Sequence, residues 1–166
     1  MMEKISSGFG FTLVELMIVI SIIAVLSAIA IVSFTNLQQN SRDAKRKSDL
    51  VMVQGALEQY HADQNYYPLP TGTSSNGFLT FGSSLNSPDG KRTYLGSVPT
   101  DPTSTTAPYS YETQPSSPAC NNSSGNFCTN YCLYAHMENS SNGSFSIACP
   151  TPTPGGANYN YAVSAP

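Results

Sequence analysis

The sequence predicts an α+β fold, in which one long N-terminal helix packs on a small antiparallel β-sheet that carries disulfides. All twelve prolines lie at or after Pro68, and a helical pattern fills the chain between Phe11 and that point. The four cysteines lie between Cys120 and Cys149, in a stretch rich in Ser, Asn and Thr. At 166 residues the chain has room for one domain with a modest core.

The apolar segment 11–34 has the length and composition of a membrane span. Its single charged residue is Glu15. As a helix the segment is about 36 Å long, enough to cross a hydrocarbon core of about 30 Å. The alternative is a cleaved secretion signal, for which Ala28-Ile29-Ala30 offers a small-x-small site. Against this alternative, the apolar stretch is longer than a typical signal and carries an acidic residue near its start.

The helical pattern continues past the apolar segment as an amphipathic helix. Four large side chains recur at steps of three and four residues, which places them on one helix face. The charged segment 42–49 is predicted to be a solvated helix surface. Because no proline precedes Pro68, one helix is predicted from Phe11 to about Asp63. The residues of the apolar face are Leu50, Val53, Leu57 and Tyr60.

A β-hairpin is predicted near the C-terminus. Residues 131–138 and 144–149 have strand patterns, and the segment between them is rich in Asn, Ser and Gly. Centring the turn on this segment places Cys132 opposite Cys149, where an antiparallel pair brings side chains within reach of a disulfide. Residues 157–163 are predicted to add a last edge strand.

Disulfides are the predicted state of the cysteines. Zinc sites favour close ligand pairs with supporting histidines, whereas 7, 3 and 16 residues separate these cysteines. With Cys132 and Cys149 paired, Cys120 and Cys128 close the loop 121–127. Disulfides place the C-terminal part outside the cytoplasm. The positive-inside rule points the other way, because Lys4 is the only base before the span and four bases follow it closely.

The segment KISSGFGFTLVEL, from Lys4 to Leu16, resembles the class III leader junction of type IV prepilins. The resemblance implies membership of the family of type IV pilins and type II secretion pseudopilins, with the type IV pilin fold. In that family a membrane peptidase cuts after the glycine, on the cytoplasmic side, and methylates the new amino terminus. Cleavage between Gly10 and Phe11, N-methylation at Phe11 and a cytoplasmic N-terminus are therefore expected.

The resemblance divides the chain into four parts. They are a leader (1–10), a transmembrane and assembly helix (11–34), its amphipathic continuation (35–64) and a loop-rich β head domain (65–166). The family often has glycine and proline where this chain has Ala24 and Val32. Those two residues in the family are linked to local melting of the helix in assembled pili. Alanine and valine are compatible with an unbroken helix, which leaves melting in a filament open.

Glu15 is the predicted assembly residue. A carboxylate within a membrane helix costs about 2.5 to 3.5 kcal/mol at the helix centre and less near the interface. The family resemblance implies that Glu15 of one subunit faces the Phe11 amino terminus of its neighbour in a filament. The alternative is that Glu15 sits at the lipid headgroups, is solvated there and has no role in assembly.

Residues 94–102 and 108–111 resemble the segment that leads into the sheet in the major pseudopilins of type II secretion. A short element is predicted before them, around 78–85. Those pseudopilins can bind calcium in this region, but Asp89, Asp101 and Glu112 lack the spacing of a calcium loop. No metal site and no cofactor is therefore predicted.

The sequence favours a structural role and not an enzyme. His61 and His136 have no nucleophile or acid at a recognisable spacing. The net charge of -3, with only 10% charged residues, argues against nucleic acid as the main partner.

The predicted function is a structural subunit of a type IV pilus or of a pseudopilus like that of type II secretion. Its expected partners are copies of itself in a helical filament, a prepilin peptidase, an assembly platform and, before assembly, membrane lipid. The expected location is the cytoplasmic membrane, crossed once, and then an extracellular filament or periplasmic pseudopilus. The alternative function is a minor pilin or a membrane-anchored adhesin, and a DNA-uptake filament also remains open.

Overall fold

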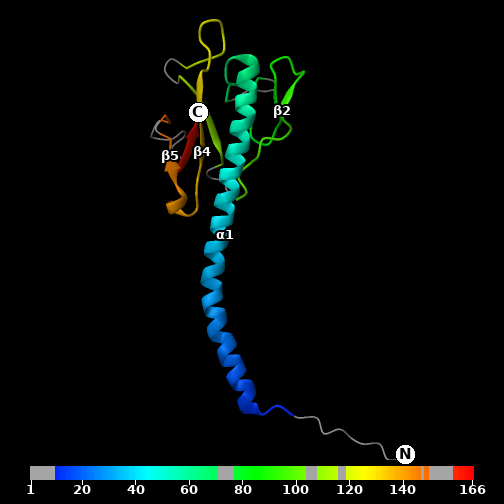
Figure 1. Ribbon diagram of the computed structural model, residues 1–166, viewed down its shortest axis with the longest axis vertical. Coiled ribbons are helices and arrows are strands. Elements are labelled where there is room, and N and C mark those ends of the chain that lie inside the picture. Colours follow the sequence, from blue (N-terminus) through cyan, green and yellow to red (C-terminus); the bar gives the residue numbers. More distant parts are fainter. Residues whose placement is uncertain (1–9, 71–76, 104–107, 116–118, 147, 150–158) are drawn as a thin grey trace, which may run out of the picture. The chain divides into compact units, whose positions relative to one another are not determined.

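A single helix, α1 (Leu13–Gln64), forms the N-terminal part of the computed structural model (Figure 1). The prediction of one helix from Phe11 to about Asp63 is confirmed to within two residues. The helix ends at Asn65, whose φ of 63° is left-handed and whose N–H donates to the carbonyl of His61 at 2.8 Å. The structure describes residues 10–70, 77–103, 108–115, 119–146, 148–149 and 159–166.

Contacts divide the chain into an N-terminal unit, residues 1–38, and a C-terminal unit, residues 39–166. In the N-terminal unit the large apolar side chains that the structure describes are 50% exposed or more. Within the described residues α1 is the one helix that is long and apolar enough to cross a membrane, judged by length and composition. The helix is unbroken at Ala24 and Val32.

The described residues of the C-terminal unit form two sheets. The smaller sheet pairs β1 (Leu85–Asn86) with β2 (Thr93–Leu95) in antiparallel fashion. The larger sheet has the order β3-β4-β6-β5. Its strands are β3 (Ser110–Gln114), β4 (Asn130–Ala135), β5 (Ser144–Phe145) and β6 (Tyr161–Ser164), with a 3₁₀ turn, η1 (Ser140–Asn142), before β5. The α+β class is confirmed, although β5 and β6 run parallel.

The predicted hairpin is wrong. β4 pairs with β6, whose Ser164 lies opposite Cys132, and β5 does not pair with β4. The last strand is therefore not an edge strand, because β6 lies between β4 and β5 (Figure 1). The predicted element around 78–85 is also shorter than expected. It is reduced to a bridge between Phe78 and Leu69 and to the start of β1.

The core of the C-terminal unit joins α1 to the inner face of the larger sheet. The predicted apolar face of α1 is confirmed, since its four residues are 1% exposed or less. Burying a side chain of this size contributes roughly 1.5 to 3 kcal/mol. The sheet contributes Tyr111, Tyr131, Leu133 and Ala135 to the same buried cluster.

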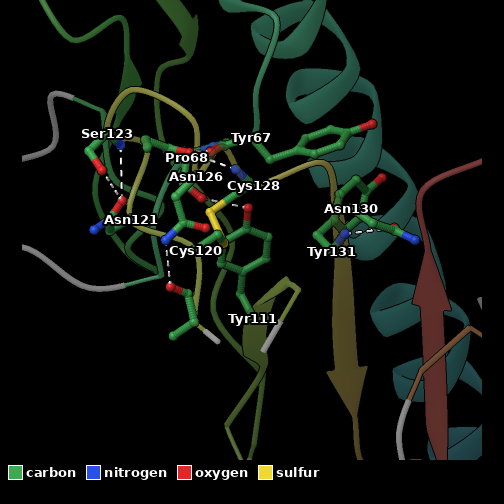
Figure 2. Close-up of a disulfide and its surroundings, with 12 residues drawn as sticks. Tyr67, Pro68, Tyr111, Cys120, Asn121, Ser123, Asn126, Cys128, Asn130 and Tyr131 are labelled. Atoms are coloured by element: carbon green, nitrogen blue, oxygen red, sulfur yellow. Dashed lines mark hydrogen bonds between the residues drawn. A yellow bond between two sulfur atoms is a disulfide. The ribbon is translucent and has the colours of Figure 1, made fainter. Parts of the chain in front are cut away.

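The Cys120–Cys128 disulfide closes a loop next to the end of α1 (Figure 2). The Tyr67 N–H donates to the Cys128 carbonyl at 2.9 Å, and the Tyr111 hydroxyl donates to the Pro68 carbonyl at 2.7 Å. The first bond ties the loop, and the second ties β3, to the segment that follows the helix.

The second disulfide joins Cys132 to Cys149 on the other face of the larger sheet, where both belong to a small buried cluster with Tyr134 and Ala162. This is the pair that the sequence argument named, but Cys149 is not in a strand beside β4. The two sulfur atoms meet next to β6, where Cys149 Sγ lies 3.7 Å from the Val163 carbonyl oxygen.

Candidate functional site

The predicted cleavage junction lies at the exposed N-terminal end of α1. Phe11 is 89% exposed. A Cβ built on Gly10 would meet no described atom within 4 Å, and the backbone of Gly10 is not left-handed. Neither packing nor backbone conformation in the described chain therefore requires glycine at this position.

Glu15 completes a capping box with Thr12 at the start of α1. The Thr12 N–H and hydroxyl donate to Glu15 Oε2 at 2.9 and 2.8 Å, and the Glu15 N–H donates to the Thr12 hydroxyl at 3.2 Å. This reciprocal arrangement satisfies N–H groups that have no partner within the helix. Sequence reasoning missed this role, although the spacing Thr-x-x-Glu signals it. Glu15 thus has a partner within its own chain.

A second polar site, which we call the base network, joins α1 to two later segments. Its centre is Arg46, whose side chain is 1% exposed. Arg46 Nε and Nη2 donate to the two carboxylate oxygens of Asp101 at 2.7 and 3.2 Å. Arg46 Nη1 donates to Asp43 and to Glu138, both at 2.9 Å. The base network comprises Arg42, Asp43, Arg46, Asp101 and Glu138.

Asp43 fixes the connection between β4 and β5 onto α1. Its two carboxylate oxygens accept the backbone N–H groups of Glu138 and Asn139 at 2.9 and 3.0 Å. Asn142 Nδ2 donates to the same carboxylate at 3.0 Å. Asp43 is fully buried, and burial would raise its pKa, but these hydrogen bonds and the one from Arg46 lower it.

Glu138 is held by two guanidinium groups. Arg42 donates to both carboxylate oxygens of Glu138, and the distance from Arg42 Nε to Glu138 Oε1 is 2.7 Å. Arg46 donates a third hydrogen bond to Glu138. Hydrogen bonding from Arg42, followed by that from Arg46, lowers the pKa of Glu138 from 4.5 to about 2 against the effect of burial. Burial would lower the pKa of Arg46, but its bonds to Asp101 and Glu138 outweigh burial and raise it. The lowered pKa values of Asp43 and Glu138 and the raised pKa values of Arg42 and Arg46 keep these four groups ionised at neutral pH.

The prediction that segment 42–49 is a solvated surface is wrong for three of its residues. Asp43, Arg46 and Asp49 are 5% exposed or less. Their burial is possible because the rest of the unit supplies polar partners. Asp101 accepts from Arg46, and the Glu138 N–H donates to Asp43. The Tyr109 hydroxyl donates to Asp49 at 2.9 Å. A signal was present, since positions 43 and 46 continue the three-and-four spacing of the apolar face.

The pH dependence of stability tests the base network. The folded-state pKa of Glu138 is depressed, so its contribution is complete above about pH 4.5 and is lost as the pH falls towards about 2. We expect the thermal midpoint of the wild type to fall more steeply across this range than that of Glu138→Gln. Thermal melts of both proteins at a series of pH values measure this. A constant difference between the two midpoints down to pH 2 would contradict the assignment.

The other residues considered for chemistry lie apart from one another. His61 stacks on Tyr67, with ring centroids 4.5 Å apart. Asp89 accepts from the Ser87 hydroxyl at 2.5 Å, and Glu112 accepts from the Tyr134 hydroxyl at 3.5 Å. Among the described residues no group of three or more His, Cys, Asp or Glu side chains is arranged to hold a metal ion.

Comparison with known proteins finds relatives among bacterial filament and secretion proteins. The family model for the prokaryotic N-terminal methylation motif matches residues 7–31. The type II secretion system core protein G of Klebsiella pneumoniae is 36% identical over 103 residues, which are 56% of this chain and 67% of that protein. The protein of the same name from Escherichia coli is 31% identical over 98 residues, 56% of this chain and 65% of that protein.

A pilin is also among the relatives. The type IV major pilin protein PilA of Myxococcus xanthus is 40% identical over 58 residues, which cover 35% of this chain and 26% of that protein. The match thus spans about two thirds of the secretion proteins and about a quarter of the pilin. No solved structure matches the chain.

Proposed function

This chain belongs to the family of type IV pilins and type II secretion pseudopilins, and from that premise we propose how it is processed and assembled. It is a pilin-like structural subunit. In the proposal it is made as a precursor, cut between Gly10 and Phe11, methylated at Phe11 and polymerised through α1. Its named relatives are structural proteins of filaments and secretion systems, not enzymes.

The surroundings of Gly10 support processing at this junction. The methylation motif covers it, and the end of α1 is exposed there. Nothing in the described chain requires glycine at position 10. In this proposal the prepilin peptidase is what requires a residue without a side chain there. A peptidase must bring its catalytic groups close to the scissile backbone, which a side chain at this position obstructs.

The exposed apolar surface of α1 supports a membrane location before assembly. Side chains all around the helix are exposed from Phe11 to Ile29 and from Phe34 to Leu37, which in water is unfavourable. A lipid bilayer covers them before assembly, and the helices of neighbouring subunits cover them in a filament. The two disulfides support a position of the C-terminal unit on the oxidising side of the membrane, and the proposal therefore has a cytoplasmic N-terminus.

The single observation that carries polymerisation is the position of Glu15 within this apolar surface. A carboxylate there is costly in lipid, and the capping box offsets only part of that cost. In the proposed filament Glu15 also faces the Phe11 ammonium of a neighbouring subunit, which neutralises both charges. Its partners are therefore copies of this chain, delivered by a pilus or secretion assembly platform.

We expect Gly10→Val to block leader removal. In the wild type the mature chain should begin at Phe11 with an added methyl group, and it should occur in filaments from the sheared cell-surface or periplasmic fraction. In the variant the branched side chain should obstruct the peptidase, so the precursor should accumulate in membranes. Intact mass spectrometry of both fractions measures this, with Gly55→Val as a control.

Gly55 is a fair control because a Cβ there would also meet nothing within 4 Å. A Gly10→Val protein shortened by ten residues would show that the junction is misassigned. A wild-type N-terminus at Ile31 would instead identify the chain as a secreted protein cut by signal peptidase.

A further inference from the structure

The two faces of the larger sheet carry different residues, which allows the path of the last strand to be followed. The inner face meets α1 and includes Leu133, together with Val163 and Ala165 from the last strand and the tail. The outer face holds the Cys132–Cys149 disulfide, with Tyr159 packed against the same cluster. The Tyr159 side chain thus packs on the outer side and the Ala165 side chain on the inner side.

The Cys132–Cys149 disulfide closes a covalent ring around β6. The ring consists of residues 132–149, which include most of β4, the turn η1 and all of β5. β6 lies between β4 and β5 (Figure 1) and pairs with both, so these two segments of the ring flank it.

At the start of β6 the ring lies on the inner side of the strand. The connection between β4 and η1 rests on α1, because Asp43 accepts the N–H groups of Glu138 and Asn139. Met137 of the same connection is buried in the inner cluster. The Tyr159 side chain packs on the outer face, so the chain that leads into β6 passes on the outer side of this connection. Next to Tyr159, Asn160 Nδ2 donates to the Met137 carbonyl at 2.9 Å.

At the end of β6 the ring lies on the outer side of the strand. The disulfide crosses the outer face, with Cys149 Sγ 3.7 Å from the Val163 carbonyl oxygen. The tail leaves on the inner side, where Gln54 Nε2 of α1 donates to the Ser164 carbonyl at 2.9 Å. A strand that enters over one side of a ring and leaves under the other passes through it.

We propose that β6 is threaded through the covalent ring closed by Cys132 and Cys149, so that this disulfide is a latch that retains the C-terminal strand in the sheet. Closing the latch oxidises two thiols to a disulfide. The two electrons and two protons pass to an external disulfide oxidant, which is reduced to a dithiol. In the unfused chain used as the reference below, two small residues, Ala165 and Pro166, follow β6 and can pass through a closed ring.

The threaded path makes the order of folding and oxidation matter when the C-terminus carries a bulky group. A domain fused after Pro166 ends on the inner side of the ring. If the ring is already closed in the unfolded chain, that domain must pass through it before β6 can take its place. If the ring is open, β6 is laid into the sheet first and the ring closes over it afterwards.

The test uses the full chain in detergent, fused after Pro166 to a small cysteine-free domain that stays folded in the denaturant. We expect the fusion to lose the ability to refold when it is reduced in denaturant, reoxidised there and only then diluted, because the ring closes while the fused domain is outside it. Denatured with its native disulfides intact, the fusion should stay threaded and should refold. The same fusion should refold when it is reduced, diluted from denaturant and then oxidised. The unfused chain should refold by each of these routes. Amide hydrogen exchange of β6, read by mass spectrometry, reports whether the strand is in place.

The fusion with Cys132→Ala and Cys149→Ala is the matched control, because it keeps the Cys120–Cys128 disulfide but has no ring around β6. It should regain protection of β6 after the same reoxidation in denaturant. If the fusion molecules that form Cys132–Cys149 in denaturant, identified by peptide mapping without reduction, regain full protection of β6 on dilution, the strand is not threaded. If the fusion oxidised after dilution refolds while the fusion oxidised in denaturant does not, the proposal stands even where the double variant is unstable.

Discussion

Glu15→Leu is expected to abolish filaments while leaving membrane insertion and leader removal intact. In the proposed filament the substitution strands the Phe11 ammonium of the neighbouring subunit in an apolar bundle. Breaking a buried pair of this kind costs about 3 to 5 kcal/mol, and the cost recurs at every subunit. The measurement compares polymer in the sheared fraction with processed subunit left in the membrane.

The capping box suggests a sharper version of this experiment, because Glu15 caps α1 as well as carrying a charge. Glutamine also serves at this position of a capping box, so Glu15→Gln removes the charge and keeps the cap. If the charge pair drives assembly, Glu15→Gln should lose filaments as Glu15→Leu does. If the cap alone matters, Glu15→Gln should assemble normally.

Thr12→Val is the complementary control. It removes the hydroxyl that exchanges hydrogen bonds with Glu15 and leaves the charge in place. Losing a cap typically costs about 1 kcal/mol, so filament yield should fall little if charge pairing is the main effect. Filament yield at the wild-type level from both Glu15 variants would remove this residue from the assembly mechanism.

Arg46→Met is expected to destabilise the C-terminal unit by about 3 to 5 kcal/mol, because it leaves the buried carboxylates of Asp43 and Asp101 without their shared guanidinium group. Of the substitutions considered for this unit it should have the largest effect. Denaturant unfolding of the full chain in detergent, followed by near-ultraviolet circular dichroism of the tyrosines, measures it.

Lys45→Met is the matched control on the same helix. The Lys45 side chain is 57% exposed, and its ammonium lies 3.4 Å from Asp49. Exposed pairs contribute about 0 to 1 kcal/mol, so this variant should unfold close to the wild type. A similar loss of stability in both variants would contradict the view that burial makes the base network important.

The long helix and its apolar face could be predicted because their signals are local. The steps of three and four residues at Leu50, Val53, Leu57 and Tyr60 require only that the chain is helical. The absence of proline before Pro68 permits one continuous helix, and Pro68 itself predicts that the helix ends before it. The leader junction is likewise a run of adjacent residues.

The base network could not be predicted with the same reasoning. A charged residue on a helix is usually solvated, and nothing near Arg46 in the sequence says that Asp101 and Glu138 will come to it. Those partners lie 55 and 92 residues away. Whether a charge is buried is decided by the surface that packs against it, and that surface exists only in the folded unit.

The sequence by itself determined the helix, its two differing halves and the confinement of the cysteines to one segment, and it predicts the junction between Gly10 and Phe11. The tertiary structure decided the strand order, the burial of Arg46 and the way in which Cys132 meets Cys149. Strand patterns in residues 131–149 suit a hairpin, but in the folded unit β4 pairs with β6, so β5 cannot pair with the same edge of β4. The physical reason is that periodicity and turn residues act between neighbours in the chain, whereas pairing partners are chosen by the total burial and hydrogen bonding of the folded unit.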